Sequence, residues 1–440
     1  MTPRTLKELE ARLTHFLEEL LEPMGRSERR HWARLYVEGL LLDGERKSIE
    51  PMASRIPGAD VQALRQFVGQ SPWAVEQVQG RLAQKVVDLL SEAEVWVLDE
   101  TSFPKAGRHS VGVARQYCGA LGKVANCQVA VSLHWSSAEA SCPIWWGLYL
   151  PKEWLEDKER AREVKLPPGT VYRSKTQLAL EAVDQALAWG LPSLPVVADS
   201  AYGNDFSFRQ ALRERHLPYA VQVEPTTVVW KEDPNLPVPA PKKKKMGRPR
   251  RYPPPEALAR PQRLEKVAQT LPGSAWRTVS WRQGRRGAQR SRFAMLPVWA
   301  AHGWRQQAHP PRVREELLVE WPEGEKQPTK YWLAQLGSQP LGLRRLVRIA
   351  KARWRIEQDY RGLKGELGLD HYEGRQWLGW HHHVCLVTMA YAFLRFEQAR
   401  LKKTSGATWS LPRARRQLLA LLIRLSGRCA WCLTEFTDTS

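Results

Sequence analysis

The feature that most constrains this chain is a pair of short apolar runs that each lead directly into an aspartate. Residues 95–98 (VWVL) precede Asp99, and residues 194–198 (LPVVA) precede Asp199. Runs this short and this apolar are typical of buried strands. Aspartate is a poor strand residue, and its charge is costly to bury without a partner. Two strands that each end in a carboxylate therefore predict a site at which a cation is bound.

The segments around these two runs predict a mixed α/β fold. Strand-like and helix-like stretches follow one another at 127–135 and 144–150, then 175–189, then 205–214 and 219–223. The first two are expected to pair antiparallel with the strand that ends at Asp99. Strands, helix, strand, helix and strand form the order of a mixed sheet with helices on its faces.

The first 90 residues predict helices without strands, because apolar residues recur there at intervals of three and four. Two short helices, 49–56 and 61–68, are separated by the tight turn Pro57-Gly58. This arrangement suits a helix-turn-helix. A plain helical hairpin in a bundle explains the same pattern equally well.

The charge of the chain predicts a polyanionic partner. There are 67 Lys and Arg against 46 Asp and Glu, a net charge of +21. The chain has no run of about 18 apolar residues and no signal-peptide core, which favours nucleic acid over a membrane surface and predicts a soluble, cytoplasmic protein. From residue 242 to 292, 16 basic residues stand against two acidic ones, so two thirds of the excess charge lies in one short segment.

This basic segment opens a stretch, 224–340, that resembles an insertion into the α/β pattern. Its later half alternates and is rich in aromatic residues, which predicts a small antiparallel sheet from 276–281, 291–299, 317–321 and 331–336. Gly247-Arg248-Pro249 resembles an AT-hook, whose arginines enter the minor groove, although a solvated basic tether is the simpler explanation. We expect DNA contacts from Lys242, Lys243, Lys244, Lys245, Arg248, Arg250, Arg251, Arg282, Arg285 and Arg286.

A third carboxylate is expected on a helix that runs from 342 to about 366. At 3.6 residues per turn, one face of this helix carries Arg353, Glu357, either Tyr360 or Arg361, and Lys364, which places a carboxylate between cations that could hold phosphates. Asp359 and Glu366 lie off that face. Further helices are predicted at 376–401 and 412–425.

The cysteines and clustered histidines give no strong metal signal. Six scattered cysteines do not form a disulfide framework. Cys429 and Cys432 make a CxxC, but no second pair completes a zinc site. The consecutive residues His381, His382 and His383 would point in three directions on a helix, so they are interpreted as packing or DNA contacts.

These residues resemble the bacterial insertion-sequence transposases of the DDE superfamily. Arg353, Glu357 and Lys364 match the spacing of the family's signature of arginine, three residues, glutamate, six residues and lysine, although Ala350 stands where a tyrosine is expected. The segment that begins Asp99-Glu100-Thr101 and continues to residue 107 resembles the first catalytic motif. The segment 199–203 (DSAYG) resembles the second.

The resemblance implies an RNase H-like mixed sheet with flanking helices, interrupted by a β-rich insertion. It further implies that Asp99, Asp199 and Glu357 are catalytic and hold two Mg²⁺ ions, for which Mn²⁺ can substitute. Arg353, Lys364, Arg361 and Lys105 would contact DNA phosphates. In related enzymes an aromatic residue of the insertion holds a flipped base, and the candidates here are Trp276, Trp281, Trp299 and Trp304.

The expected organisation is a helical DNA-binding region at 1–90, a core in two parts at 91–223 and 341–402, the basic insertion at 224–340 and a helical tail at 403–440. The expected function is transposition: water cuts each element end, and the released 3′ hydroxyl attacks target DNA. The partner is double-stranded DNA, bound by a homodimer or larger assembly in the bacterial nucleoid. The alternatives are a nuclease that cuts without joining and an inactive, transposase-derived DNA-binding protein.

Overall fold

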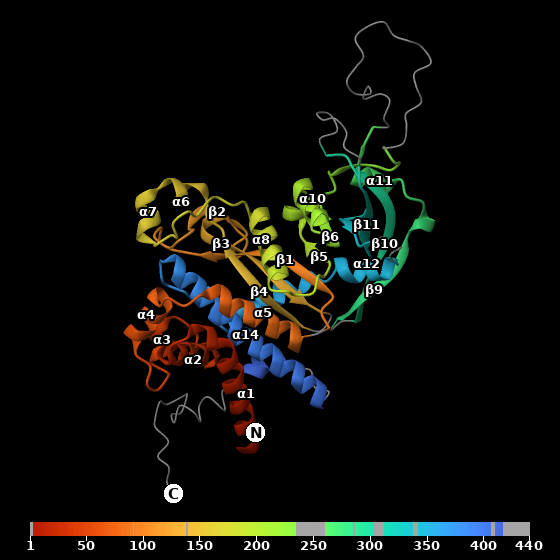
Figure 1. Cartoon of the computed structure of the whole chain (residues 1–440). Helices are drawn as coiled ribbons and strands as arrows, with labels where there is room; N and C mark the ends of the chain where they lie inside the picture. The colour runs from red at the N-terminus through yellow and green to blue at the C-terminus, as the bar shows by residue number, and fades with distance from the viewer. Residues whose placement is uncertain are drawn as a thin grey trace, which may run out of the picture. The chain divides into compact units, whose positions relative to one another are not determined.

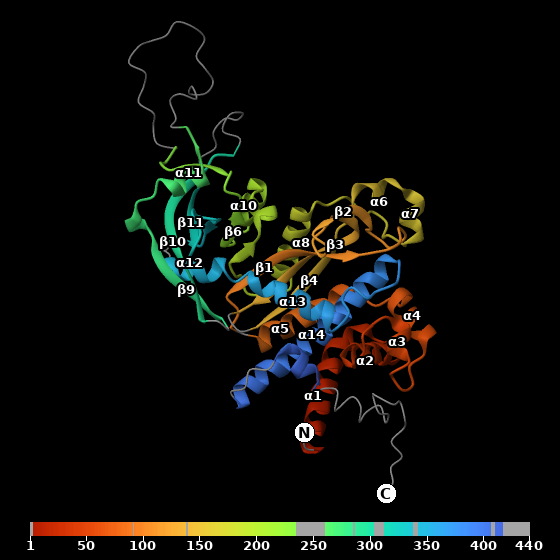
Figure 2. The same cartoon turned by 180° about the vertical axis from the view of Figure 1, so that it is seen from behind.

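The computed structural model forms two compact units, the first made of Met1–Pro192 with Trp354–Ser440 and the second of Ser193–Arg353. Figures 1 and 2 show the chain from opposite sides. Both units contain a sheet flanked by helices, so the mixed α/β class expected from the sequence is confirmed. The structure describes residues 3–90, 92–137, 140–234, 260–284, 287–302, 312–337, 342–405 and 410–416.

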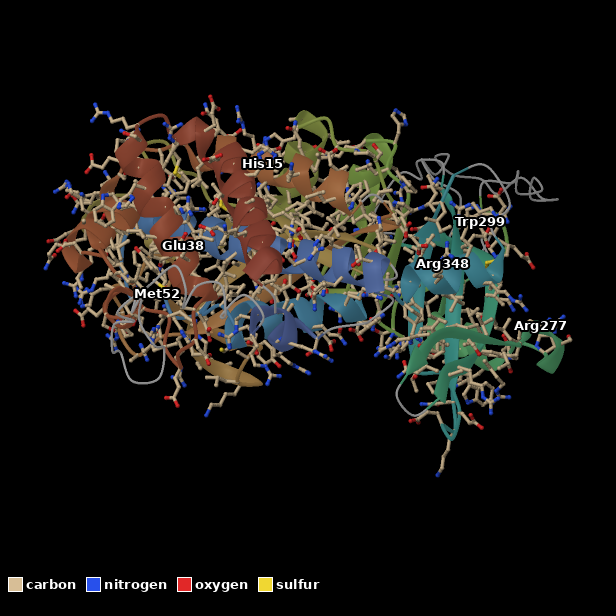
Figure 3. The ribbon with its side chains drawn as sticks, turned by 90° about the horizontal axis from the view of Figure 1, so that it is seen from below. His15, Glu38, Met52, Arg277, Trp299 and Arg348 are labelled. Carbon is tan, nitrogen blue, oxygen red and sulfur yellow. The ribbon has the colours of Figure 1, made fainter. Side chains whose placement is uncertain are left out.

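The first unit begins with the expected helices, which pack on a long helix from the other end of the chain. They are α1 (Pro3–Leu21), α2 (Ser27–Leu41), α3 (Ile49–Ala53), α4 (Val61–Gln70) and α5 (Val75–Leu89), with a 3-10 turn, η1, at Glu22–Met24. Helix α14 (Trp377–Ser405) contacts α2, α4 and α5. Side chains fill the space between these helices, and Met52 of α3 is fully buried there (Figure 3).

The sheet of the first unit is antiparallel. Its strands are β1 (Val95–Pro104), β2 (Ala114–Cys118), β3 (Lys123–Ser136) and β4 (Ser141–Leu148). The long strand β3 pairs with β1 along one edge and with β2 and β4 along the other. The prediction that both following strands pair with β1 was therefore right for β3 and wrong for β4.

Strand β1 does not end at Asp99, as the sequence predicted, but continues to Pro104. The reason is tertiary, because β3 offers hydrogen-bonding partners along this whole length, down to Cys127 opposite Pro104. The apolar run ends at Leu98, but the hydrogen-bonded pairing of β1 with β3 continues beyond it. Asp99 thus lies in the middle of a strand instead of at its end.

Helices cover both faces of this sheet. Helix α8 (Lys175–Ala188) contacts β3 and β4, and it begins with a capping box made by Ser174 and Gln177. Helix α13 (Trp354–Gly365) contacts β1, β4 and α14. Two short helices, α6 (Lys152–Glu156) and α7 (Lys158–Glu163), complete the unit.

The second unit is built on a sheet in the order β5-β6-β12-β11-β10-β7-β8, with β9 paired to β10. Strands β5 and β6 are parallel, and the other pairs are antiparallel. The bounds are β5 (Val196–Ala198), β6 (Tyr219–Val223), β7 (Val228–Trp230), β8 (Gln262–Arg263), β9 (Arg277–Gly284), β10 (Gly287–Ala300), β11 (Arg314–Pro322) and β12 (Lys330–Gln335).

The four strands expected in the insertion are present as β9 to β12, but they do not make a sheet of their own. Strand β12 pairs antiparallel with β6, so the insertion strands continue the sheet that β5 and β6 begin. Trp299 on β10 and Arg348 mark this unit in Figure 3. The helices of the unit are α9 (Ser200–Gly203), α10 (Phe206–Glu214), α11 (Leu264–Gln269) and α12 (Leu343–Ala350), with a 3-10 turn, η2, at Gly273–Ala275.

The prediction of a single helix from 342 to 366 is wrong. A turn at residues 351–353 separates helix α12 from helix α13. Lys351 explains why α12 ends where it does. Its Nζ donates to both carboxylate oxygens of Glu320 at 2.9 Å and lies 4.3 Å from the ring centre of Trp281. The end of α12 is thereby held within the second unit, and α13 starts afresh in the first.

Candidate active site

Asp99 is almost buried in the middle of β1, with 7 % of its surface exposed. Its Oδ1 accepts a hydrogen bond from the backbone N–H of Glu100 at 2.9 Å. In the β1–β3 register Asp99 stands directly opposite Ser132, so both side chains point to the same face. Glu100 points to the other face, where it forms an ion pair with Lys175 of α8 at 2.8 Å.

Helix α13 covers the Asp99 face of β1. The hydroxyl of its Tyr360 lies 2.7 Å from Ser132 Oγ, level with Asp99. Glu357 is exposed in the first turn of α13 and precedes Tyr360 by three residues, a rise of about 4.5 Å along the helix. The structure therefore brings the turn that carries Glu357 to the side of the sheet that Asp99 faces.

The other two carboxylates of this region are engaged elsewhere. Asp359 is buried and accepts hydrogen bonds from Tyr391 Oη at 2.8 Å and from His134 Nδ1 at 2.9 Å. Glu366 pairs with Arg415 at 2.7 Å. Both lie off the Glu357 face, as the helical spacing predicted.

The two lysines expected to contact phosphates donate to backbone carbonyls. Lys364 Nζ donates to Ser102 O at 2.7 Å and lies 5.1 Å from the ring centre of Phe103. Lys105 Nζ donates to Tyr372 O at 2.6 Å. Burial lowers the pKa of both ammonium groups. In this conformation they tie α13 and the 371–376 segment to β1 and to the residues that follow it.

The two arginines of the signature lie in different surroundings. Arg361 is exposed on α13, one turn after Glu357. Arg353 lies in the turn before α13 and belongs to the second unit. The helix predicted to carry Arg353 is interrupted just before α13, so the place of Arg353 on the Glu357 face stays a prediction.

Asp199 follows β5 in the second unit and caps the short helix α9. Its Oδ1 accepts from Ala201 N at 3.0 Å. Asp199 is thus a helix-capping residue in this conformation. The turn is packed tightly, since a Cβ on Gly203 would lie 1.9 Å from Gln222 O. Only glycine fits at this position without moving α9 off β6.

The donor set suits a hard divalent cation. Mg²⁺ prefers a few carboxylate oxygens and keeps several waters, and Asp99 and the exposed Glu357 are such donors on one side of β1. Among the described residues, no three His, Cys, Asp or Glu side chains form a group that could hold a metal. The predicted set of three carboxylates therefore stays a prediction.

Comparison with known proteins decides the family. The family model described as DDE superfamily endonuclease matches residues 19–288. The chain belongs to this family. The matched segment contains Asp99 and Asp199 and ends before Glu357, so it covers two of the three predicted catalytic residues.

Two further similarities accompany this DDE superfamily match. Over 188 residues the chain is 30% identical to the probable transposase for insertion sequence element IS701 of Microchaete diplosiphon. That match covers 42% of this chain and 46% of the relative, so it spans about half of the relative's length. The cryo-EM structure of a piggyBac transposase synaptic complex with hairpin DNA has a TM-score of 0.44 and 9% identity, covering 91% of this chain and 71% of that one.

Most of the cations predicted to bind DNA in this DDE superfamily chain lie outside the described residues. These cations are Lys242, Lys243, Lys244, Lys245, Arg248, Arg250, Arg251, Arg285 and Arg286. Trp304 and the Cys429/Cys432 pair also lie outside the described residues. Arg282 is described and is half-buried on β9. No helix in the described part of the chain combines the length and apolarity that crossing a membrane requires.

The described tryptophans of the insertion contribute to packing. Trp276 is buried in the core of the second unit, with its ring 5.2 Å from that of Trp321. Trp281 packs edge-on against Phe293 at 5.6 Å. Trp299 is half-buried on β10. Packing within the second unit therefore accounts for Trp276 and Trp281.

The consecutive histidines are packing residues in α14. His382 stacks on Trp73 with ring centres 3.8 Å apart. His383 is fully buried, its Nδ1 lies 2.8 Å from Tyr36 Oη, and its Nε2 lies 3.1 Å from Gly368 O. A carbonyl only accepts, so Nε2 carries the proton and Nδ1 accepts from the tyrosine. This bonding satisfies a neutral imidazole.

We expect acid to destabilise the first unit through His383. Burial lowers the pKa of His383 from 6.5 to about 3. Below pH 6.5 the imidazole of His383 binds a proton in the unfolded chain but not in the folded chain. The contribution of neutral His383 to the free energy of unfolding is therefore complete above pH 6.5 and is lost as the pH falls. At pH 5 the loss is about 2 kcal/mol. Urea unfolding at pH 7 and pH 5 measures it.

The matched variants for this test are His383→Gln and His15→Gln, since His15 is exposed on α1. The first should reduce the difference in unfolding free energy between the two pH values. The second should leave it unchanged. An undiminished difference in His383→Gln would contradict the assignment.

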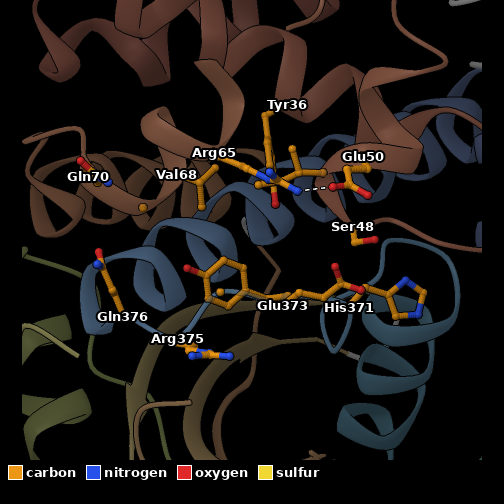
Figure 4. A pocket seen from close by; sticks show the side chains of 14 residues that line it. Tyr36, Ser48, Glu50, Arg65, Val68, Gln70, His371, Glu373, Arg375 and Gln376 are labelled. Carbon is orange, nitrogen blue, oxygen red and sulfur yellow. Dashed lines mark hydrogen bonds and ion pairs between the residues drawn. The ribbon is translucent and has the colours of Figure 1, made fainter. Parts of the chain in front are cut away.

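A cavity of about 410 Å³ lies between helices α3 and α4 and the 371–376 segment of the first unit (Figure 4). Arg65 and Glu50 form an ion pair on its helical side. Tyr372, whose carbonyl accepts from Lys105, is part of its wall. Sequence analysis missed this cavity, because its walls come from segments that are far apart in the chain and carry no shared motif.

Proposed function

We propose that this chain is a DNA transposase that binds the ends of an insertion sequence, cleaves them and joins the released 3′ ends to target DNA. The observation that carries the proposal is the seating of α13 on the Asp99 face of β1, through the 2.7 Å contact between Tyr360 and Ser132. This contact puts Glu357 within one helical turn of the level of Asp99. The family match and the name of the IS701 relative support the same reaction class.

In this proposal the core of the chain is RNase H-like, and Asp99, Asp199 and Glu357 together hold two Mg²⁺ ions. Two metal ions bound by these residues would activate the attacking oxygen and stabilise the leaving oxygen in phosphoryl transfer. Asp199 is the third member of this proposed set. It can bind a metal ion while capping α9, because one carboxylate oxygen makes that bond and the second stays available.

The cations of α13 have separate tasks. Exposed Arg361 binds a phosphate of the DNA strand being cut, with Arg353 contributing from the preceding turn. Lys364 and Lys105 act first through the backbone, because Lys364 ties α13 to β1 and Lys105 ties the 371–376 segment to the residues after β1. A positioning role for these two lysines agrees with their burial.

The partner is double-stranded DNA, and the net charge of +21 supplies the sequence-independent part of the affinity. Cutting two element ends together requires at least a homodimer on DNA. The site of action is the nucleoid in the cytoplasm. Helices α3 and α4 belong to the region proposed to bind the element end.

The test uses the inverted repeats that flank the coding sequence in its source genome. Labelled duplex carrying one such end is incubated with the protein and Mg²⁺ or Mn²⁺, together with an unlabelled target plasmid. We expect strand cleavage at the repeat boundary and labelled plasmid from strand transfer, both lost in Asp99→Asn. Asp205→Asn is the matched control, because Asp205 only caps α10 and asparagine caps equally well.

Each outcome distinguishes a reaction class. Cleavage without labelled plasmid indicates a nuclease that does not join. Binding of the repeat without any metal-dependent product indicates a DNA-binding protein descended from a transposase. Products that persist in Asp99→Asn reject Asp99 as a catalytic residue.

A further inference from the structure

A buried chain of polar groups in the first unit ends beside Asp99. Asp359 and His134 are 2 % and 0 % exposed, and the Asp359 carboxylate accepts from Tyr391 Oη at 2.8 Å. His134 Nδ1 lies 2.9 Å from Asp359, and its Nε2 lies 3.0 Å from Ser132 Oγ. Well-packed apolar residues can replace a buried polar group with little loss of stability. Such a network therefore calls for a reason other than folding.

The carboxylate at the inner end sets the direction of the hydrogen bonds. The Asp359 carboxylate accepts from the Tyr391 hydroxyl on one side and contacts His134 Nδ1 at 2.9 Å on the other. A carboxylate oxygen accepts, so the proton of the second contact belongs to His134 Nδ1. In the neutral ring Nε2 then accepts from the Ser132 hydroxyl. The Ser132 oxygen is left to accept from Tyr360 at 2.7 Å.

The outer end of the chain is the phenol of Tyr360. Its hydroxyl lies 2.7 Å from Ser132 Oγ and donates its proton to that oxygen. Ser132 stands directly opposite Asp99 on the neighbouring strand. The lone pairs of the phenol oxygen are consequently available on the side of the proposed catalytic centre.

We propose that Tyr360 is a positioning residue of this centre, held beside Asp99 by the buried chain of Ser132, His134 and Asp359, and that its phenol oxygen accepts a hydrogen bond from water bound at Asp99. The inference rests on the proposed function, since it assigns a task within that site. The ring of Tyr360 is fixed independently of its hydroxyl, edge-on to His134 at 5.6 Å and near Trp146 at 6.1 Å. Tyr360→Phe therefore removes the acceptor and leaves the packing.

The decisive experiment compares Tyr360→Phe with wild type in two measurements. Single-turnover cleavage of the labelled element end is expected to slow by about 10- to 100-fold, as is usual when a group that orients a metal site is lost. The affinity of the DNA-free protein for Mn²⁺, measured by electron paramagnetic resonance, should fall about tenfold. Binding of the element-end duplex should not change.

Ser132→Ala tests the chain itself. It leaves the phenol in place but removes the hydroxyl that accepts the proton of the phenol. The single-turnover cleavage rate and the Mn²⁺ affinity should therefore both fall. The double variant Tyr360→Phe/Ser132→Ala should lose no more than the worse single variant, because both act through one hydrogen bond. Losses that multiply would overturn the idea of a single chain.

Tyr331→Phe is the matched control, since it removes a buried tyrosine hydroxyl bond, to Pro328 O at 3.2 Å, in the second unit. It should change neither measurement. Wild-type cleavage and Mn²⁺ affinity in Tyr360→Phe, with Asp99→Asn inactive, would overturn this inference and leave the proposed function standing. Activity in Asp99→Asn would overturn the proposed function itself.

Discussion

Replacing Glu357 by glutamine is expected to reduce metal-dependent DNA cleavage by roughly 10³-fold or more. The amide keeps the size of the side chain and loses the charge that holds a divalent ion. A ligand charge is worth several kcal/mol of transition-state stabilisation, and each 1.36 kcal/mol is about a factor of ten in rate. Glu357 is exposed in the first turn of α13, so the substitution leaves the fold intact.

The control for this prediction is Glu366→Gln on the same stretch of chain. Glu366 pairs with Arg415 and lies off the Glu357 face, so its loss should leave the cleavage rate within a factor of about two. Single-turnover cleavage of the element-end duplex measures both variants. Equal rates for the two variants would remove Glu357 from the site and with it the assignment of the third ligand.

Replacing Arg209 by methionine is expected to destabilise the second unit by about 3–5 kcal/mol. Arg209 and Glu315 are 2 % and 1 % exposed, and their Nε and Oε1 atoms are 3.0 Å apart. The variant leaves the Glu315 carboxylate buried, with Tyr219 Oη as donor at 2.7 Å and Arg213 more distant at 3.8 Å. Urea unfolding followed by circular dichroism measures the loss.

A second substitution separates charge from packing. In Arg209→Met/Glu315→Leu the buried charge is gone, and most of the lost stability should return. A double variant that is as unstable as Arg209→Met would show that the loss comes from packing. Arg209 also donates to Gly203 O at the end of α9. The same ion pair therefore steadies the turn that Asp199 caps, and its loss should lower cleavage as well as stability.

The local sequence pattern predicted those helices and strands whose signal lies within a few adjacent residues. The run at 194–198 contains strand β5, the run at 219–223 is strand β6, the helical stretch at 175–189 contains α8, and the 49–70 region has two short helices. In each case the hydrophobic period lies within a few adjacent residues. The family was recognisable for a similar reason, since its motifs are short and contiguous.

Partners far along the chain decided the rest. β1 runs past Asp99 because β3 pairs with it, β12 joins β6 instead of a separate sheet, and the helix expected across 351–353 breaks where Lys351 binds Glu320. The candidate site shows the same division. Spacing singled out Asp99, Asp199 and Glu357, and their joint role in catalysis stays a prediction.

The sequence by itself determined the mixed α/β class, the family motifs and the carboxylates worth testing, because composition and period are properties of neighbouring residues. Tertiary structure alone decided that α13 lies on the Asp99 face and that Ser132, His134, Asp359 and Tyr360 form one buried chain. Two of those hydrogen bonds, from Tyr360 to Ser132 and from His134 to Asp359, join residues more than 200 positions apart. No local preference encodes such a contact, because it exists only once the sheet and its covering helix have packed together.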